Sequence, residues 1–163
     1  MLTAVLDGHL DALRDEVLAL PTGDDSPFAG VPGTHNGRFV VVSTDPSPTA
    51  RRRAGGLPAP MLMCSAVIDR DPREWVRDLL GELGDRADAI WSHCAGWRDT
   101  TDPVEYLASH RVPPVLSFAT WDAPVDRVRV ALAGHATAKS LAVRAQHMTP
   151  DELVAAYRAE FAR

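Results

Sequence analysis

Residue types that can do chemistry gather at two points of an otherwise apolar sequence. The first is Gly33–Arg38, which contains a histidine, an asparagine and an arginine and runs directly into an apolar stretch. The second is Ser92–Cys94, which follows another apolar stretch. An imidazole beside a buried strand is costly unless it finds a partner or a ligand. We therefore take His35, His93 and Arg38 as the candidate catalytic residues.

These residues suit acid–base chemistry on a small molecule. Either His35 or His93 would serve as the general base, because a neutral imidazole titrates near the operating pH. Arg38 and Asn36 would stabilise a developing enolate or phenolate. Cys94 would point to the opposite face of a regular strand from His93, so a Cys–His dyad is not expected. The alternative is that each polar group is structural and simply has a hydrogen-bond partner.

A flat apolar ligand would find rings and thioethers close to these groups. We expect a cavity lined by four substrate-binding residues besides Asn36, namely Trp91, Met61, Met63 and Trp121. Three hypotheses follow. The protein is an enzyme acting without a cofactor on a partly apolar or aromatic metabolite, by acid–base, cyclisation or oxygenation chemistry; or it binds haem; or it is a non-catalytic binding or assembly module.

The haem hypothesis uses the same polar residues in other roles. His35 or His93 would be the axial ligand of the iron, and Arg38 would lie near a propionate or the distal face. No spaced carboxylate completes a ligand triad with the two histidines, so no other metal is expected. The favoured hypothesis is an enzyme that needs no cofactor. Haem is the cofactor of the alternative hypothesis.

Composition narrows the classes of partner. The chain has 163 residues, 45% hydrophobic and 24% charged, which fits a single domain over 1–163. The net charge of −5 comes without a basic stripe, so a nucleic-acid partner is not expected. We also expect no membrane partner and a cytoplasmic location, since no apolar run approaches about 20 residues and no secretory leader is evident. Two cysteines make no disulfide framework.

Apolar spacing and helix-capping residues predict the elements. Asp71 with Pro72 and Asp102 with Pro103 are typical helix starts, as is Thr149 with Glu152. The predicted elements are a helix over 2–20, a loop over 21–34, strands over 37–44 and 60–68, a helix from Asp71 to Gly84, a strand over 88–95, a short helix from Asp102, a strand over 113–120, a helix over 124–146 that Gly134 and His135 break, and a C-terminal helix from Thr149.

This order predicts an α+β fold. Four strands with helices between them fit a ferredoxin-like four-stranded antiparallel sheet, permuted, with helices packed on it and N- and C-terminal helices added. Residues 45–59, with the arginines Arg51–Arg53, are expected to form a long mobile hairpin loop. Adjacent apolar residues in 39–42 and 61–64 indicate that both faces of the sheet are covered, which favours a homodimer.

Short motifs also resemble a known group of proteins. They are Ser26-Pro27-Phe28, Pro32–His35 and Trp91–Cys94, within an arrangement that spans residues 26–120. This arrangement resembles small bacterial proteins of the dimeric α+β-barrel group, which includes antibiotic-biosynthesis monooxygenases, chlorite-dismutase-like haem proteins and dye-decolorising peroxidases. The resemblance implies natural-product tailoring, oxidoreductase-like activity or haem binding. The Gly-x-x-Asp-Gly distal motif of the peroxidases does not occur in this sequence.

Overall fold

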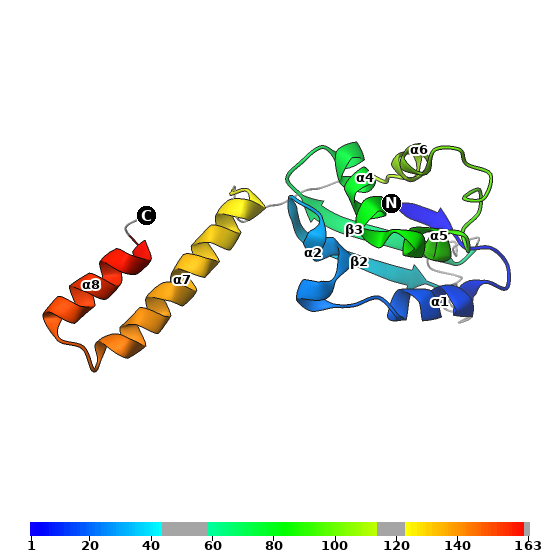
Figure 1. The fold of residues 1–163 in the computed structure, drawn as a ribbon. Helices are drawn as coiled ribbons and strands as arrows, with labels where there is room; N and C mark the ends of the chain where they lie inside the picture. The colour runs from blue at the N-terminus through cyan, green and yellow to red at the C-terminus, as the bar shows by residue number, and fades with distance from the viewer. Residues whose placement is uncertain (44–58, 114–122, 162–163) are drawn as a thin grey trace, which may run out of the picture. The chain divides into compact units, whose positions relative to one another are not determined.

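A computed structural model describes residues 1–43, 59–113 and 123–161 (Figure 1). Internal contacts divide the chain into two compact units, Met1–Ala119 and Thr120–Arg163, and each is described by itself. The expected hairpin loop, the expected strand over 113–120 and Trp121 fall almost wholly outside the described residues. The single domain over 1–163 stays a prediction.

The first unit contains one antiparallel sheet of three strands. Its strands are β1 (Leu2–Ala4), β2 (Thr34–Val42) and β3 (Met61–Ile68), in the order β1-β3-β2. The predicted pairing of the two long strands as antiparallel neighbours is confirmed. A four-stranded ferredoxin-like sheet is not present in the described residues, which form a mixed α+β structure around three strands.

The prediction of one helix over 2–20 is wrong. The chain forms β1 first and then α1 (Leu10–Leu18), with Gly8 at a φ of 75° between them. Val5 donates its N–H to the Pro60 carbonyl at 2.8 Å, which extends the contact with the sheet. The apolar spacing fits a helix equally well, but pairing with β3 satisfies the backbone of residues 2–4 and outweighs local helix preference.

Two further helical segments occupy the predicted loop over 21–34. They are a 3₁₀ turn, η1 (Gly23–Asp25), and a single helical turn, α2 (Pro27–Gly30). The side chain of Ser26 accepts a hydrogen bond from the Phe28 N–H at 3.3 Å and caps this turn. The turn carries Phe28 into the core, so this segment contributes to packing as well as connecting two elements.

The capping signals predict the next helices correctly. In α4 (Pro72–Leu83), the Asp71 carboxylate accepts from the N–H groups of Arg73 and Glu74, and Gly84 ends the helix. In α6 (Pro103–Ser109), the Asp102 carboxylate accepts from the Glu105 N–H at 3.0 Å. A short polar side chain just before the first turn satisfies N–H groups that have no partner within the helix.

The predicted strand over 88–95 is wrong, because its first half, residues 88–91, belongs to the helix α5 (Asp85–Trp91). Its buried residues Ala87, Ile90 and Trp91 lie three and four positions apart on one helical face. A short apolar run does not distinguish a buried strand from a buried helix. Only Cys94, which makes an isolated antiparallel bridge with Val5, keeps strand-like pairing.

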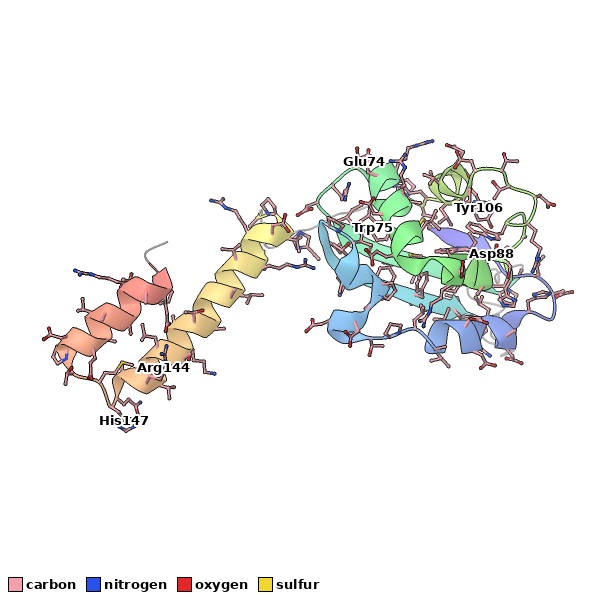
Figure 2. All side chains as sticks on the ribbon, in the orientation of Figure 1. Glu74, Trp75, Asp88, Tyr106, Arg144 and His147 are labelled. Atoms are coloured by element: carbon pink, nitrogen blue, oxygen red, sulfur yellow. The ribbon has the colours of Figure 1, made fainter. Side chains whose placement is uncertain are left out.

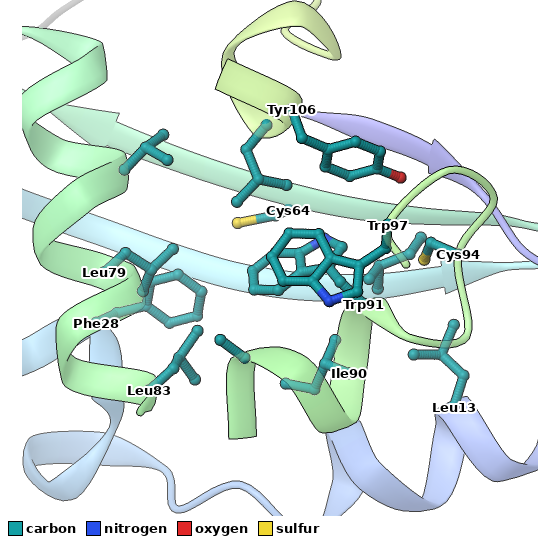
Figure 3. Close-up of a cluster of buried hydrophobic side chains, with 14 of the residues drawn as sticks. Leu13, Phe28, Cys64, Leu79, Leu83, Ile90, Trp91, Cys94, Trp97 and Tyr106 are labelled. Atoms are coloured by element: carbon teal, nitrogen blue, oxygen red, sulfur yellow. The ribbon is translucent and has the colours of Figure 1, made fainter. Parts of the chain in front are cut away.

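The core of this unit lies on one face of the sheet (Figure 3). Each described α-helix of the unit contributes to it, as do Leu62 and Cys64 of β3. The members include Leu13 of α1, Phe28 of α2, Leu79 of α4, Trp91 of α5 and Leu107 of α6. The Trp91 and Trp97 rings stack with their centroids 5.5 Å apart.

The opposite face of the sheet, here called the open face, carries the alternate residues of each strand. They are half-buried or exposed, and they are Leu2, Ala4, Asn36, Arg38, Val40, Val42, Met61, Met63, Ser65 and Val67. Most are apolar, and the described helices of the unit pack on the other side. The sheet therefore presents an apolar surface with a polar end.

The second unit is a pair of helices, α7 (Val125–Ala145) and α8 (Pro150–Phe161). The predicted long helix is confirmed, but it continues through Gly134 and His135 without a break. Thr149 and Glu152 form the predicted capping box, since the Thr149 N–H donates to the Glu152 carboxylate at 2.8 Å. Arg144, labelled in Figure 2, forms an ion pair with Glu160 across the two helices. In the described parts of the chain, no helix combines the length and apolarity needed to cross a membrane.

Candidate functional site

A β-bulge at the start of β2 decides where His35 lies. Thr34 pairs with Ile68 and Asn36 pairs with Val67, so His35 is an extra residue with no partner on β3. In a regular strand, His35 and Gly37 would both face the core, because they are two positions apart. With the bulge, Thr34 faces the core in place of His35. Thr34 is 6% exposed, whereas His35 stays accessible.

The buried neighbours of the bulge hold it in place. Trp75 of α4, labelled in Figure 2, donates its Nε1–H to the Thr34 Oγ1 at 2.7 Å. A β-carbon at position 37 would collide with the ring of Phe28, so glycine lets α2 approach the strand closely. A buried hydrogen bond and a close backbone approach thus fix the strand on either side of His35.

Asp69 is the partner that the structure gives to His35. The His35 Nε2 lies 3.5 Å from the Asp69 Oδ2, with side chains 23% and 26% exposed. Asp69 is held by its N–H, which donates to the Gly33 carbonyl at 3.0 Å. Gly33 has a φ of 73°, and a β-carbon there would collide with the Asp69 carboxylate. A carboxylate at one ring nitrogen orients an imidazole and leaves the other nitrogen, Nδ1, available for chemistry.

Four predicted residues share the open face of the sheet. Asn36 and Arg38 lie on it at the polar end, and Arg38 is opposite Ser65. Met63 and Met61 continue the same face, opposite Val40 and Val42. No ion pair of Arg38 occurs among residues 1–43, 59–113 and 123–161. Among these residues, the Arg38 guanidinium thus lies next to an apolar surface.

His93 and Trp91 lie elsewhere, so in the described residues they do not share a cavity with Met61 and Met63. Trp91 is 1% exposed and packs in the core against Phe39, on the face away from Met61 and Met63. The reason is that residues 85–91 are a helix covering the sheet rather than a strand within it.

The two candidate bases are at opposite ends of the sheet. His35 lies beside the Ile68 end of β3, whereas the His93 carbonyl accepts from the Leu6 N–H, beyond the Met61 end. At about 3.3 Å per residue, the length of β3 separates these ends by about 23 Å. One substrate therefore cannot use His35 and His93 together.

His93 instead meets His9, which the sequence does not mark as a site residue. Their Nδ1 atoms are 2.9 Å apart, although 84 positions separate the residues in the sequence. In the sequence, His9 only borders the apolar stripe of the helix predicted over 2–20. Spacing along the chain carries no signal for such a contact, because folding of β1 against residues 93–95 creates it.

The cysteines are unsuited to nucleophilic chemistry. Burial raises the pKa of Cys94, and its Sγ accepts a hydrogen bond from the Thr3 Oγ1 at 3.3 Å, which opposes the rise. Burial also raises the pKa of Cys64 to about 12. The thiolate is the reactive form, so both behave as small apolar residues.

A hollow of about 570 Å³ lies between the loop after α5 and helix α6. His110 borders it and donates from Nδ1 to the Tyr106 carbonyl at 2.7 Å, which leaves its Nε2 unprotonated in the neutral ring. Tyr106, labelled in Figure 2, donates its hydroxyl to the Ala95 carbonyl, and burial raises its pKa to about 12. None of the predicted site residues that the structure describes lines this hollow or a second one of about 290 Å³ beside α2.

Metal ligands do not cluster in the part of the chain that the structure describes, where no group of three or more His, Cys, Asp or Glu residues is suited to a metal ion. The cavity expected for a flat ligand is not assembled there either, since Trp91 lies on one face of the sheet and the two methionines on the other. No protein family, curated protein or solved structure matches this chain.

Proposed function

We propose that this protein is a small-molecule enzyme that uses His35 as a general base on a partly apolar substrate bound at the open face. The observation that carries the proposal is the bulge at Thr34–Asn36. It removes His35 from the core-facing position and leaves it 3.5 Å from Asp69. Bulges that re-aim a side chain are over-represented next to active sites.

The reaction class that suits these residues is removal of a proton next to a carbonyl or from a phenol. Asp69 would hold the His35 ring through Nε2, so that Nδ1 accepts the substrate proton. The negative charge then develops on an oxygen, where Arg38 and Asn36 would stabilise it. A cyclisation or an oxygenation of the resulting anion could follow this common first step.

The apolar body of the substrate would lie along the same face of the sheet. Val40, Met61 and Met63 continue from the polar end and offer an apolar surface without charge. Methionine adapts to ligands of irregular shape, and its sulfur interacts favourably with aromatic rings. His93 and Trp91 take no part in this proposal, because the sheet and its core separate them from His35.

The proposal includes the covering of this face by a second copy of the chain, as predicted from the sequence. It also includes a fourth strand from residues 113–120, giving a permuted ferredoxin-like sheet. The outer edge of β1 already bonds to Ala95 and His110. The outer edge of β2 makes no backbone bond within the described ranges, which favours that edge for a further strand.

Solvent deuterium incorporation tests this function across several classes of acidic compound at once. Purified protein in D₂O is mixed with a panel of aryl ketones, 1,3-diketones and polyketide-like phenols, and mass spectrometry follows exchange of their acidic C–H positions. We expect catalysed exchange for at least one compound class. His35→Gln should lower the rate by about 10²-fold or more, and Asp69→Asn by less, since Asp69 only orients the ring.

The control is His147→Gln in the second unit, which removes an imidazole far from β2 in the sequence and should leave exchange unchanged. Arg38→Gln should weaken turnover of carbonyl substrates while circular dichroism stays the same. Equal exchange rates in wild type, His35→Gln and Asp69→Asn would falsify the assignment of His35 as the base.

A further inference from the structure

The two imidazoles of His9 and His93 meet head to head. Their Nδ1 atoms are 2.9 Å apart, their ring centroids are 5.2 Å apart and the rings are inclined at 62°. This centroid separation is close to the largest that a 2.9 Å nitrogen contact permits. In each ring, the line from the centroid through Nδ1 therefore points at the other nitrogen, as in a well-aligned hydrogen bond.

Backbone bonds hold both rings in this position. The Leu6 N–H donates to the His93 carbonyl at 2.9 Å, and the Ala95 N–H donates to the Ala4 carbonyl at 2.9 Å. The His9 carbonyl accepts from the Leu13 N–H at 3.0 Å, at the start of α1. Both histidines are half-buried, so the rings are held by the fold on either side of their contact.

The hydrogen bond determines which nitrogens of the neutral pair carry protons. One Nδ1 must carry a proton and the other must be bare, because a hydrogen bond needs one donor and one acceptor. In the neutral pair, the donor ring therefore has a bare Nε2, and the acceptor ring has a protonated Nε2. The pair presents a base at one outer nitrogen and an acid at the other.

We propose that His9 and His93 form a proton relay between their two Nε2 atoms. A proton binds the bare Nε2 of one ring, the Nδ1 proton of that ring crosses to the Nδ1 of the other, and the second ring releases its Nε2 proton. One proton enters, one leaves, and both rings end neutral with their tautomers exchanged. The ligands suited to the two ends are a weak oxygen acid, such as water, a phenol or an enol, and a proton acceptor of the same class.

A shared proton fits the geometry better than a shared metal ion. Two imidazoles on one ion would direct their lone pairs at a third point, with each nitrogen about 2.0–2.1 Å from it. Here the nitrogens point at each other, and within the described residues no third metal-ligating side chain completes a group with them.

Nitrogen-15 NMR of histidine-labelled protein tests the relay directly. For the neutral pair in mildly alkaline solution, we expect one proton coupled to both Nδ1 atoms. Exchange of tautomers should move both Nδ1 shifts to values between those of bare and protonated nitrogen. Two rings locked in single tautomers at all temperatures, or two rings protonated only at Nε2, would overturn the proposal.

Variants supply the matched comparison. In His9→Gln and in His93→Gln, the remaining ring should lose the intermediate Nδ1 shift, while His147→Gln should change neither ring. The wild-type spectrum decides the matter even if a variant fails to fold. Addition of Zn²⁺ to the wild type provides a further arm: stoichiometric shifts of both Nδ1 signals would assign the pair to a metal and contradict the relay. This test is independent of the exchange assay on His35.

Discussion

Burial distinguishes the two cysteines of this chain from the proposed site residues His35 and Asp69. The two cysteines are among the most buried side chains of the first unit, and burial raises the pKa of both thiols. His35 and Asp69 keep about a quarter of their side-chain surface exposed. Solvent access together with a polar partner therefore favours the histidine over the cysteines as a reactive group.

Alkylation of the thiols checks this ranking. In native protein treated with iodoacetamide at about pH 8, we expect neither Cys64 nor Cys94 to react, because the thiolate is scarcely populated. In guanidinium chloride both should react, and intact-mass spectrometry counts the added groups. Rapid native labelling of Cys94 would contradict the burial described here.

The residue types of the site could be predicted from the sequence, but their partners could not. Asn36, Arg38, Met61 and Met63 do share one face, as alternation along two strands implies. Asp69 as the partner of His35 depends on the bulge and on the hydrogen bond from the Asp69 N–H to the Gly33 carbonyl at the same end of the sheet. Such partners come from long-range pairing, which a single sequence does not reveal.

At the scale of elements, the two glycines Gly37 and Gly81 have opposite roles. Gly37 lies in β2 under the ring of Phe28, whereas a β-carbon at Gly81 in α4 would meet open space. One glycine permits a close approach, and the other only weakens a helix.

Alanine substitution at these positions gives a matched pair. We expect Gly81→Ala to stabilise the protein by about 0.5–1 kcal/mol, through the better helix propensity of alanine. Gly37→Ala should destabilise it by about 1–3 kcal/mol, because Phe28 must move in a packed core. Urea unfolding followed by circular dichroism measures both changes, and effects of the same sign would contradict the packing at Gly37.

Acid should loosen the start of α8. Hydrogen bonds from the Thr149 backbone and hydroxyl lower the pKa of Glu152 from 4.5 in the folded state. The charged form is therefore favoured by folding, so its contribution is present above pH 4.5 and is lost as the pH falls through the lower folded value. Glu152→Gln keeps an acceptor but does not titrate.

Carbon-13 shifts of residues 150–156 measure this loss. In the wild type, the helical shifts should decline as the pH falls below 4.5, and in Glu152→Gln this part of the decline should be absent. An identical pH response in the two proteins would show that the capping box does not couple to the titration.

Elements with capping signals were predictable, whereas short apolar segments were not. Asp71, Asp102 and Thr149 each satisfy N–H groups of the following helix, which is a local effect. Residues 2–4 and 88–91 were assigned the wrong type, because an apolar run of this length fits either a strand or a helix. Tertiary pairing decides between the two.

At the scale of the whole molecule, the open face raises the question of what covers it. It is largely apolar, and the described helices of its unit pack on the opposite side. Its apolar residues are mostly half-buried, and apolar surface that stays partly accessible can mark a contact site. The homodimer proposed above would cover this surface with a second sheet and enclose a substrate between the two.

Light scattering after size-exclusion chromatography tests the dimer. We expect wild-type protein at twice the 17.6 kDa chain mass, and Val40→Lys at the monomer mass, because a buried lysine opposite Met63 has no partner. Leu18→Lys at the exposed end of α1 is the control and should not change the mass, since Leu18 is 80% exposed. A monomeric wild type would refute the dimer without bearing on His35.

The bulge in β2 adds a residue, His35, that the proposed site uses and that the pairing of the sheet does not require. If His35 were deleted, Thr34 and Gly37 would remain on the core face and Asn36 on the open face, and the strand would pair with β3 without interruption. The sheet thus has no need of this residue. A protein that lacks this one position should keep its fold and lose the imidazole. Deletion of His35, rather than its substitution, is therefore the cleanest way to separate structure from activity.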